Sequence, residues 1–496
     1  MAVTRMKYEH YVCFLLILTL MLFQVVDKTE AEWLNHGGDI TNRRFAVGEL
    51  KISPKSVKNL KLRWSFFVGN DISATPAIAN GVVYFPSWDG YLYALNAFNG
   101  DLVWKQHLGQ LTGLPATRTN VNASVSRTTP SVAGDLLLVG IFGPAVMIAL
   151  ERPTGQLVWS ATIDSRPLIV ITSSGTVHMG AYYVGVSWKK HYREIYVAHF
   201  GEVCPSIDIL RGLVFAATGN LYTAPEEVQR CEDEQNNQTT ATGPDKCIGP
   251  DVNYNSMLAF DMNSGQIRWS RQLGGYEVFF IACLIPNNTD CPSGPNLDAD
   301  FGEAPMLLTI FADGRMRDVV VAVQKSGFAW ALDRSNGELV WFKQAGPGGN
   351  EGGGIWGAAT DGKTVFTNIA NGDRIRFRLA PSNMTTTAGA WVALDANTGE
   401  ITWTTANPSN DTSQGPVSLV NGVLFAGSVA ANGPLYAMDA NTGDVHVLWS
   451  YNTGATIFGG VSASYGCIYL GNGYTVSTGA FHPWTRGIAL YAFCVI

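Results

Sequence analysis

Charged side chains are scarce in this chain, since Asp, Glu, Lys and Arg make up only 15% of its 496 residues. The net charge is −7, and Lys and Arg form no basic stripe. The composition therefore argues against a nucleic-acid partner, whose phosphates need clustered positive charge. Apolar runs with the period of a helix are essentially absent after the N-terminal segment. No Cys-x-x-Cys-His motif occurs, which excludes covalently attached c-type haem.

Glycine is abundant, and much of it recurs within one repeated segment. Residues 331–341 read Ala-Leu-Asp-Arg-Ser-Asn-Gly-Glu-Leu-Val-Trp, with an apolar run, a turn and an alternating run that ends in Trp. Gly supplies the positive φ that a tight hairpin turn needs, so this pattern predicts a strand, a turn and a second strand. Variants of the segment end at Trp104, Trp159, Trp269, Trp403 and Trp449.

The spacing of the repeats predicts the fold. Consecutive repeat tryptophans lie about 46 to 110 positions apart, which is typical of four-stranded blades with loops of variable length. One blade cannot bury both faces of its sheet, so the blades must stack radially. We predict an all-β chain with one eight-bladed β-propeller domain over residues 32–496. We expect Leu60–Phe67 and the C-terminal unit near Leu490 to complete one blade together and close the ring.

The third blade of this predicted ring is incomplete in the sequence. Between Trp159 and Trp269 there is room for two units, yet only one repeat hairpin occurs there. The stretch Ser187–Val203 is basic and aromatic and matches no other blade. We therefore expect a missing hairpin, which would leave sheet edges unpaired.

The N-terminus is typical of a secreted protein. Arg5 and Lys7 precede an apolar segment, Tyr11–Val26, and Thr29-Glu30-Ala31 offers a small-x-small cleavage site. We predict a signal peptide over residues 1–31 and, after its removal, a secreted or periplasmic protein without membrane attachment. A signal anchor is the alternative, because the apolar run approaches the shortest length that spans a bilayer.

The cysteines and the glycosylation sequons agree with an oxidising compartment. Cys13 lies in the signal segment, which leaves seven cysteines. Proximity suggests three disulfides that would tie long loops and would leave Cys204 free, namely Cys231–Cys247, Cys283–Cys291 and Cys467–Cys494. Free buried thiols are the alternative. Asn-x-Ser/Thr sequons occur at Asn122, Asn237, Asn287, Asn383 and Asn410.

The repeat, Ala-x-Asp-x-x-Thr-Gly-x-x-x-Trp, resembles the tryptophan-docking repeat of the pyrroloquinoline quinone (PQQ) dehydrogenases, and the resemblance covers nearly everything after residue 31. Four segments resemble polyvinyl-alcohol-dehydrogenase-like proteins, including plant secreted members: His36–Asp39, Ala217–Asn220, Asp298–Pro305 and Gln324–Gly327. The resemblance implies PQQ on the propeller axis, Ca²⁺ on the quinone as Lewis acid and a carboxylate as general base. It implies oxidation of secondary or polymeric alcohols, with electrons passed to an external acceptor. We expect a monomer.

The resemblance also implies roles for particular residues. Asn220 matches the calcium-binding amide, and Lys325 matches the cation that hydrogen-bonds the quinone. Glu277 falls where the catalytic Asp is expected, and Asp300 is the second candidate for that base. Trp356 could stack on a planar cofactor. Purely structural roles are the alternative for most of these residues. Asn220 and Asp300 also suit turns. Lys325 also suits a solvated strand end, and Trp356 also suits packing between blades. We expect Asn220, Glu277 and Lys325 to converge on one axial cavity.

Three departures from the family pattern leave two interpretations open, an aberrant gene model or splice form of an active enzyme, or a propeller that has lost cofactor binding, which is the second functional hypothesis. The chain has no adjacent Cys-Cys pair, it lacks the Trp-bearing segment expected before Pro205, and Tyr182-Tyr183 stand where related dehydrogenases carry a calcium-ligating Glu. Both covers of the quinone would then be lost. The second hypothesis is a secreted, non-catalytic propeller that binds protein or polysaccharide and has lost its cofactor site.

Overall fold

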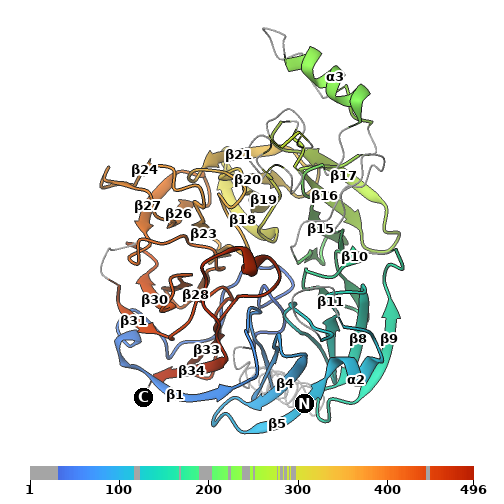
Figure 1. The fold of residues 1–496 in the computed structure, drawn as a ribbon. Helices are drawn as coiled ribbons and strands as arrows, with labels where there is room; N and C mark the ends of the chain where they lie inside the picture. Colours follow the sequence, from blue (N-terminus) through green and yellow to red (C-terminus); the bar gives the residue numbers. More distant parts are fainter. Residues whose placement is uncertain are drawn as a thin grey trace, which may run out of the picture.

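Seven four-stranded antiparallel sheets, the blades, stand around a central axis (Figure 1). The computed structural model describes residues 32–116, 123–166, 169–188, 204–221, 225–236, 246–249, 252–275, 277–279, 298–442 and 447–495, with single positions at 283, 288, 289, 291 and 296. Within these residues the short first strands of neighbouring blades lie against one another, for example β2 against β6 and β14 against β18.

Each blade is named after its strands, and six blades follow the order of the chain. The first two consist of β2 (Ala77–Ala79), β3 (Val82–Pro86), β4 (Tyr91–Asn96) and β5 (Leu102–His107), and of β6 (Ser131–Ala133), β7 (Leu136–Gly140), β8 (Val146–Glu151) and β9 (Leu157–Thr162). The next two consist of β14 (Ser206–Asp208), β15 (Leu213–Ala217), β16 (Ser256–Asp261) and β17 (Ile267–Gln272), and of β18 (Met306–Ala312), β19 (Arg315–Val323), β20 (Phe328–Asp333) and β21 (Leu339–Gln344). The last two consist of β22 (Ala359–Thr360), β23 (Thr364–Ile369), β26 (Ala390–Asp395) and β27 (Ile401–Ala406), and of β28 (Ser418–Val420), β29 (Val423–Gly427), β30 (Pro434–Asp439) and β31 (Trp449–Asn452).

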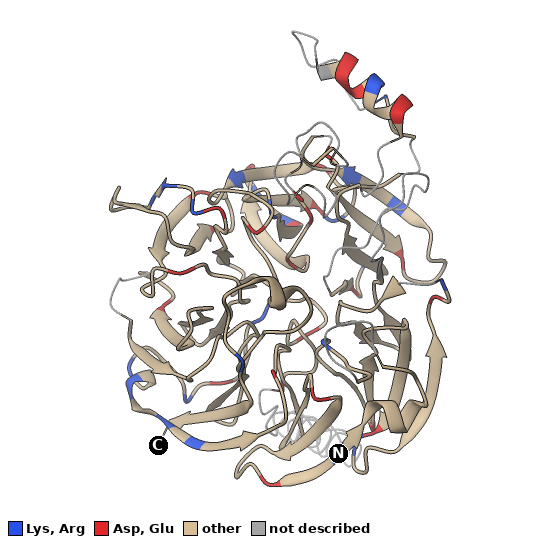
Figure 2. Ribbon diagram, in the orientation of Figure 1, with Lys and Arg blue, Asp and Glu red and all other residues tan. Residues whose placement is uncertain are grey.

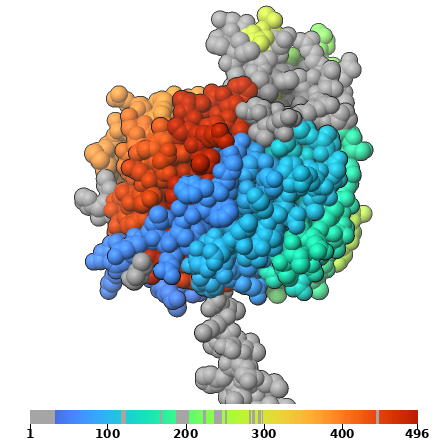
Figure 3. Space-filling model, turned by 60° about the horizontal axis from the view of Figure 1, so that its bottom comes forward, coloured from blue at the N-terminus to red at the C-terminus, as the bar shows by residue number. Residues whose placement is uncertain are grey.

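The two ends of the chain build the seventh blade together, as predicted. It consists of β32 (Ser462–Ser464), β33 (Cys467–Gly471), β34 (Ala489–Val495) and β1 (Leu60–Phe67). Strand β1 pairs antiparallel with β34 from Leu60 opposite Val495 to Phe67 opposite Ala489. Figure 3 shows the N-terminal and C-terminal segments side by side on one face. The prediction that Leu60–Phe67 closes the ring is confirmed.

The prediction of an eight-bladed propeller is wrong, because the structure has seven blades. Where the third blade was expected, the described residues form only two-stranded pairs: β10 (Ile169–Val170) with β13 (Ser187–Trp188), and β11 (Thr176–His178) with β12 (Ala181–Tyr183). The physical reason is the missing repeat hairpin, since the outer two strands of every four-stranded blade come from such a hairpin or from the ring closure.

Six tryptophans each join one blade to the next, and the β6–β9 blade is the exception among the described residues. Their indole N–H groups donate to backbone carbonyls of the following blade at 2.7 to 3.1 Å, in the pairs Trp64–Ala97, Trp104–Arg152, Trp269–Arg334, Trp341–Ala396, Trp403–Ala440 and Trp449–Leu60. In the pairs of Trp64, Trp104, Trp269 and Trp341 the indole also lies on the turn glycine of that blade. A Cβ on Gly155 or Gly399 would lie 2.7 or 2.6 Å from an indole carbon, so only glycine fits there.

All three predicted disulfides are confirmed. The Cα atoms are 5.5 Å apart in Cys231–Cys247, 4.8 Å in Cys283–Cys291 and 4.0 Å in Cys467–Cys494. Cys204 is free and buried, and burial raises the pKa of its thiol to about 12. The predicted signal peptide (residues 1–31) and the sequons at Asn122, Asn237 and Asn287 lie outside the described residues, whereas Asn383 and Asn410 are exposed.

Few helices accompany the blades. Among the described residues they are α2 (Leu108–Thr112), α3 (Glu226–Asn236) and the 3-10 turns η1 (Val57–Asn59) and η3 (Ser477–Phe481), and a further strand pair joins β24 (Phe377–Arg378) to β25 (Thr385–Thr386). Helix α3 projects from the ring, and much of the charge in Figure 2 lies on this helix and on the rim. Among the described helices, none has the length and apolar character needed to cross a membrane.

We predict that Trp341→Ala lowers the free energy of unfolding by about 3 to 5 kcal/mol, because the side chain is 7% exposed and its removal leaves a cavity between two blades. Trp159→Ala is the matched control. Trp159 is 40% exposed, so we expect its loss to cost less than about 1 kcal/mol. Denaturant midpoints measured at constant slope check both values, and equal losses in the two variants would contradict this account of the blade contacts.

Candidate functional site

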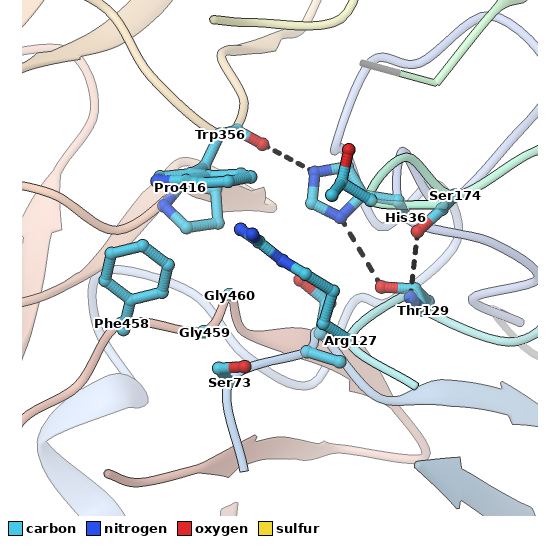
Figure 4. Close-up of a pocket in the computed structure, with 13 residues that line it drawn as sticks. His36, Ser73, Arg127, Thr129, Ser174, Trp356, Pro416, Phe458, Gly459 and Gly460 are labelled. Carbon is cyan, nitrogen blue, oxygen red and sulfur yellow. Dashed lines mark hydrogen bonds between the residues drawn. The ribbon is translucent and has the colours of Figure 1, made fainter. Parts of the chain in front are cut away.

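A pocket lies on the axis, where the segments that lead into the innermost strands converge (Figure 4). Its volume is about 30 Å³, which is room for roughly two waters. The lining residues come from the segments before β2, β6, β11, β22, β28 and β32 and from the N-terminal segment: His36, Ser73, Ala74, Thr75, Arg127, Thr129, Thr172, Ser174, Trp356, Pro416, Phe458, Gly459 and Gly460. Hydroxyl groups, one cation and two aromatic rings therefore face one hollow.

Arg127 is the cation of this pocket. Its side chain is buried, and its guanidinium carbon lies 4.6 Å from the centre of the Trp356 ring and 5.9 Å from the centres of the Phe142 and Tyr474 rings. Attraction between the guanidinium and the ring faces holds the charge there. Phe458 meets Trp356 edge to face at 5.3 Å. The pocket is therefore a positively charged, aromatic site.

His36 ties the pocket wall together in its neutral form. Its Nε2 lies 2.5 Å from the carbonyl oxygen of Trp356, and its Nδ1 lies 3.4 Å from the Thr129 hydroxyl. Because a carbonyl only accepts, the proton is on Nε2 and Nδ1 accepts from Thr129. Burial, followed by the nearby positive charge of Arg44, lowers the pKa of His36 from 6.5 to about 3. At neutral pH the imidazole is therefore uncharged.

A cluster of carboxylates around Lys325 forms a second polar group. Lys325 follows β19, and its Nζ donates to Asp298 Oδ2 at 2.8 Å and to Asp300 Oδ2 at 3.0 Å. The backbone N–H of Asn220, which follows β15, donates to Asp300 Oδ1 at 2.8 Å. The ends of two strands in neighbouring blades and the loop before β18 thus meet at Asp300.

Glu277 holds the loop before β18 by a hydrogen bond to its backbone. Its Oε1 accepts from the backbone N–H of Ala299 at 2.8 Å, and its side chain is 3% exposed. The bridge between Leu221 and Val278 places the chain around Glu277 beside the chain around Asn220. Glu277 therefore joins the cluster through the backbone between Asp298 and Asp300.

Asp298 has the most unusual environment in the cluster. Burial raises the pKa of its carboxyl well above the usual value, the negative charge of Asp300 raises it further, and Lys325 opposes the shift. Its backbone φ is +53°, a left-handed conformation that non-glycine residues seldom adopt. Trp356 has φ +73°, which is rarer still for a bulky residue. Strained residues of this kind gather at functional sites.

The buried oxygens of the cluster without hydrogen-bond partners among the described residues include Oδ1 of Asn220, whose side chain is 0% exposed, and Oδ1 of Asp298. Amide and carboxylate oxygens are the ligands that Ca²⁺ prefers. Even so, no group of three or more His, Cys, Asp or Glu side chains within the described part of the chain has the geometry of a metal site.

The structure thus brings together four of the five residues named from the sequence, Asn220, Glu277, Asp300 and Lys325. Trp356 stands apart from them in the axial pocket, which none of the four lines. The two groups are connected, since Trp356 N–H donates to the carbonyl of Gly302 at 2.6 Å. The roles that the sequence analysis gave to these five residues stay predictions.

Sequence reasoning missed Asp298, Arg127 and His36. The motif Asp-x-Asp at 298–300 was visible, but only the second Asp was singled out. His36 lies in a segment that the family resemblance had picked out. Arg127 offered no local signal, because its importance comes from the Trp356 and Tyr474 rings, which are more than 200 positions away in the sequence.

A family model named PQQ_2, and described as outer membrane protein assembly factor BamB, matches residues 56–179 and 325–478, which together are more than half of the chain. The chain belongs to this family. The matched stretches carry the repeat hairpins that end at Trp104, Trp159, Trp341, Trp403 and Trp449. A PQQ-repeat propeller is therefore the proper description of the ring, with seven blades in this member.

Two relatives of this PQQ-repeat propeller are dehydrogenases. The chain is 27% identical over 508 residues to polyvinylalcohol dehydrogenase from Pseudomonas sp. This match covers 91% of the chain and 72% of the relative. The chain is 24% identical over 336 residues to quinohemoprotein alcohol dehydrogenase ADH IIB from Pseudomonas putida, covering 64% and 48%. The crystal structure of quinohemoprotein alcohol dehydrogenase from Comamonas testosteroni has the same fold, with a TM-score of 0.69 at 18% identity over 94% of this chain and 80% of that one.

We predict that the stability of the protein falls as the pH is lowered from about 6.5 towards 3, in part because of His36. The unfolded chain binds a proton on this imidazole near pH 6.5, whereas the folded chain does so only near pH 3, so acid favours the unfolded state. In His36→Gln this contribution is absent. Denaturant midpoints measured across this pH range should therefore vary less steeply in the variant, and identical slopes would refute the assignment.

Proposed function

We propose that this propeller is a PQQ-dependent dehydrogenase that oxidises alcohols. The observation that carries the proposal is the convergence of Asn220, Asp298, Asp300 and Lys325 from three separated segments beside a cationic, aromatic axial pocket. The family membership supports it, as do relatives that are named polyvinylalcohol dehydrogenase and quinohemoprotein alcohol dehydrogenase.

The donor set of the axial pocket fits the quinone. PQQ is a planar tricarboxylate, so it needs cations, hydroxyl donors and an aromatic surface. Arg127, Thr129, Thr172 and Ser174 would bind its carboxylates, and Trp356 would lie against its plane. Because Arg127 lies over the Trp356 ring and the cavity is only about 30 Å³, binding requires the guanidinium to move off that ring. When bound, the quinone accepts the reducing equivalents of the alcohol, which no side chain can do.

The carboxylate cluster fits a calcium ion by its donor chemistry. Asn220 Oδ1 is a buried amide oxygen without a partner among the described residues, and Asp300 lies within hydrogen-bond distance of the Asn220 backbone. Glu277, Asp298 and Asp300 carry more negative charge than Lys325 balances. Asn220 and Asp300 would hold the ion, which would supply positive charge to an oxygen of the cofactor. Lys325 would hold the same carboxylates in register and remain a hydrogen-bond donor.

The contacts favour Asp298 as the general base. Both oxygens of Asp300 accept hydrogen bonds, from Asn220 and from Lys325, so Asp300 is held as an acceptor. Asp298 keeps one buried oxygen free among the described residues, and its raised pKa suits the uptake of a proton from an alcohol. Glu277, the base proposed from the sequence, accepts from Ala299 N–H and would position the Asp298 loop.

The proposal also covers the cellular location, the substrates and the electron acceptor of the enzyme. Three disulfides support a secreted or periplasmic location. We propose secondary or polymeric alcohols as substrates, by analogy with the polyvinylalcohol dehydrogenases, and an external electron acceptor, because the sequence has no haem-attachment motif.

The small pocket favours a second candidate. A non-catalytic propeller that binds protein or polysaccharide needs no room for a cofactor on the axis. In this structure the Arg127 guanidinium covers the face of the Trp356 ring. Cofactor titration separates the two candidates.

We predict saturable PQQ binding in the presence of Ca²⁺, seen as a change in quinone absorbance that EDTA reverses. Arg127→Gln should weaken binding about tenfold or more, because a charge-assisted contact to a carboxylate is lost. Asn220→Ala should remove the calcium dependence. Arg374→Gln, which changes an exposed arginine in the fifth of the six consecutive blades, is the matched control and should bind like the parent. Absence of any quinone binding would leave the non-catalytic candidate.

We predict that Asp298→Asn lowers turnover about 100-fold or more while quinone binding persists, since the substitution removes the base and keeps the shape. Glu277→Gln should act more weakly, because its amide oxygen can still accept from Ala299. Steady-state kinetics of both variants, reconstituted with PQQ and Ca²⁺, decide between them. If Glu277→Gln abolishes turnover and Asp298→Asn does not, Glu277 is the base after all.

A further inference from the structure

Four contacts between neighbouring blades follow one rule among the described residues. A repeat tryptophan donates its indole N–H to the next blade and covers that blade's turn glycine. A Cβ on Gly100, Gly155, Gly337 or Gly399 would lie 2.6 or 2.7 Å from the covering indole. Each contact therefore needs two partners, a tryptophan on one blade and an uncovered glycine turn on the next.

Trp159 is a repeat tryptophan without its turn. It lies on β9, the outermost strand of the β6–β9 blade, and its side chain is 40% exposed, whereas Trp64, Trp104, Trp341 and Trp403 are 3 to 8% exposed. Among the described residues its indole N–H has no acceptor. Val158 and Ile163 beside it are 54% and 43% exposed. The side of this blade that would meet a third blade is thus uncovered.

Gly265 is a turn glycine without its tryptophan. It has φ +70°, as in the covered turns, and no atom of the described residues lies within 4 Å of the position that a Cβ would take. The turn is nevertheless fully formed. Gly265 N–H donates to Asp261 O, and Asp261 Oδ1 accepts from the N–H groups of Asn263 and Ser264. The β14–β17 blade therefore presents a complete, empty docking turn.

Between these two blades stands the inner half of a blade. Strand β11 lies against β6 on one side and against β14 on the other, as first strands do elsewhere in the ring. It pairs with β12 across a turn at Met179-Gly180, both with positive φ. Within the described chain no strand pairs with the other edge of β12, where the third strand of a blade would lie.

From these three vacancies we infer that the gap is a docking site for a β-hairpin supplied by a partner chain. The partner would supply a hairpin of the repeat type, Ala-x-Asp-x-x-Ser/Thr-Gly-x-x-x-Trp. The first strand of this hairpin would pair with β12, its turn glycine would lie against the Trp159 indole, and its tryptophan would lie on Gly265. It would extend the blade contact that recurs around the rest of the ring.

A second copy of this chain cannot supply that hairpin from its described repeats. The turns at Gly100, Gly155, Gly337 and Gly399 already carry a tryptophan. The one bare turn, at Gly265, belongs to a hairpin whose own Trp269 is docked on the next blade. The partner is therefore a different polypeptide with a free repeat hairpin.

The test uses a synthetic peptide of residues 390–406, which reads AWVALDANTGEITWTTA and carries both docking groups, Gly399 and Trp403. We expect dye-labelled peptide to bind the full chain saturably, as measured by fluorescence anisotropy. Trp159→Ala and Gly265→Asn in the protein should each weaken binding at least about tenfold, because each removes or blocks one docking contact. Asn tolerates the left-handed conformation, so Gly265→Asn leaves the turn folded.

Matched controls separate this site from general stickiness. Phe67→Ala removes another exposed aromatic of an outer strand, and Gly362→Asn alters another bare turn glycine with positive φ, so both should bind like the parent. The Trp403→Ala peptide should bind weakly and be insensitive to Gly265→Asn. Absence of saturable binding, or binding that survives either docking substitution, would overturn the proposal. Self-association that depends on Trp159 in sedimentation experiments would also overturn it, since the occupant would then be a second copy.

Discussion

The contact of an indole with a bare glycine turn is the interaction on which the rest of this molecule depends. It is directional, because one hydrogen bond fixes the ring and only glycine leaves room for it, and it recurs between four pairs of neighbouring blades among the described residues. Each blade alone is a small sheet with two apolar faces. Stacking through these contacts buries both faces, so that the stability of one blade depends on its neighbours.

The candidate site is a consequence of this closed ring. Arg127 and the carboxylates of Asp298 and Glu303 are buried and His36 is partly buried, and burial is the largest cause that shifts the pKa values of His36, Asp298 and Glu303 towards the neutral forms. Such groups are tolerated only where neighbouring segments supply partners: aromatic faces for Arg127, a carbonyl for His36, Lys325 for Asp298. The partners of Arg127 and His36 come from segments of other blades, so the ring must close before the axial pocket exists.

The gap between the β6–β9 and β14–β17 blades shows what happens when one repeat hairpin is missing. The inner pair β11–β12 keeps its place because its contacts to β6 and β14 are local to the axis. The outer half, which needs the hairpin, does not form from the described residues. The contacts around the axial pocket are therefore kept. At the outer edge of the ring, Trp159 and Gly265 remain uncovered by the described residues.

The sequence by itself determined the repeat, and with it the all-β propeller, the closure of the ring by Leu60–Phe67, the three disulfides and the place of the missing hairpin. These are local patterns, or pairs that a repeat brings into register. It also named Asn220, Asp300 and Lys325, each of which lies in a segment that resembles the family, and Glu277, which stands where the resemblance expects the catalytic Asp. Only the tertiary structure decided that there are seven blades, because an incomplete unit becomes a blade only if its outer strands find partners. It alone revealed Asp298, strained and buried against Lys325, and Arg127 over Trp356, because burial and contacts between distant segments arise only in the folded ring.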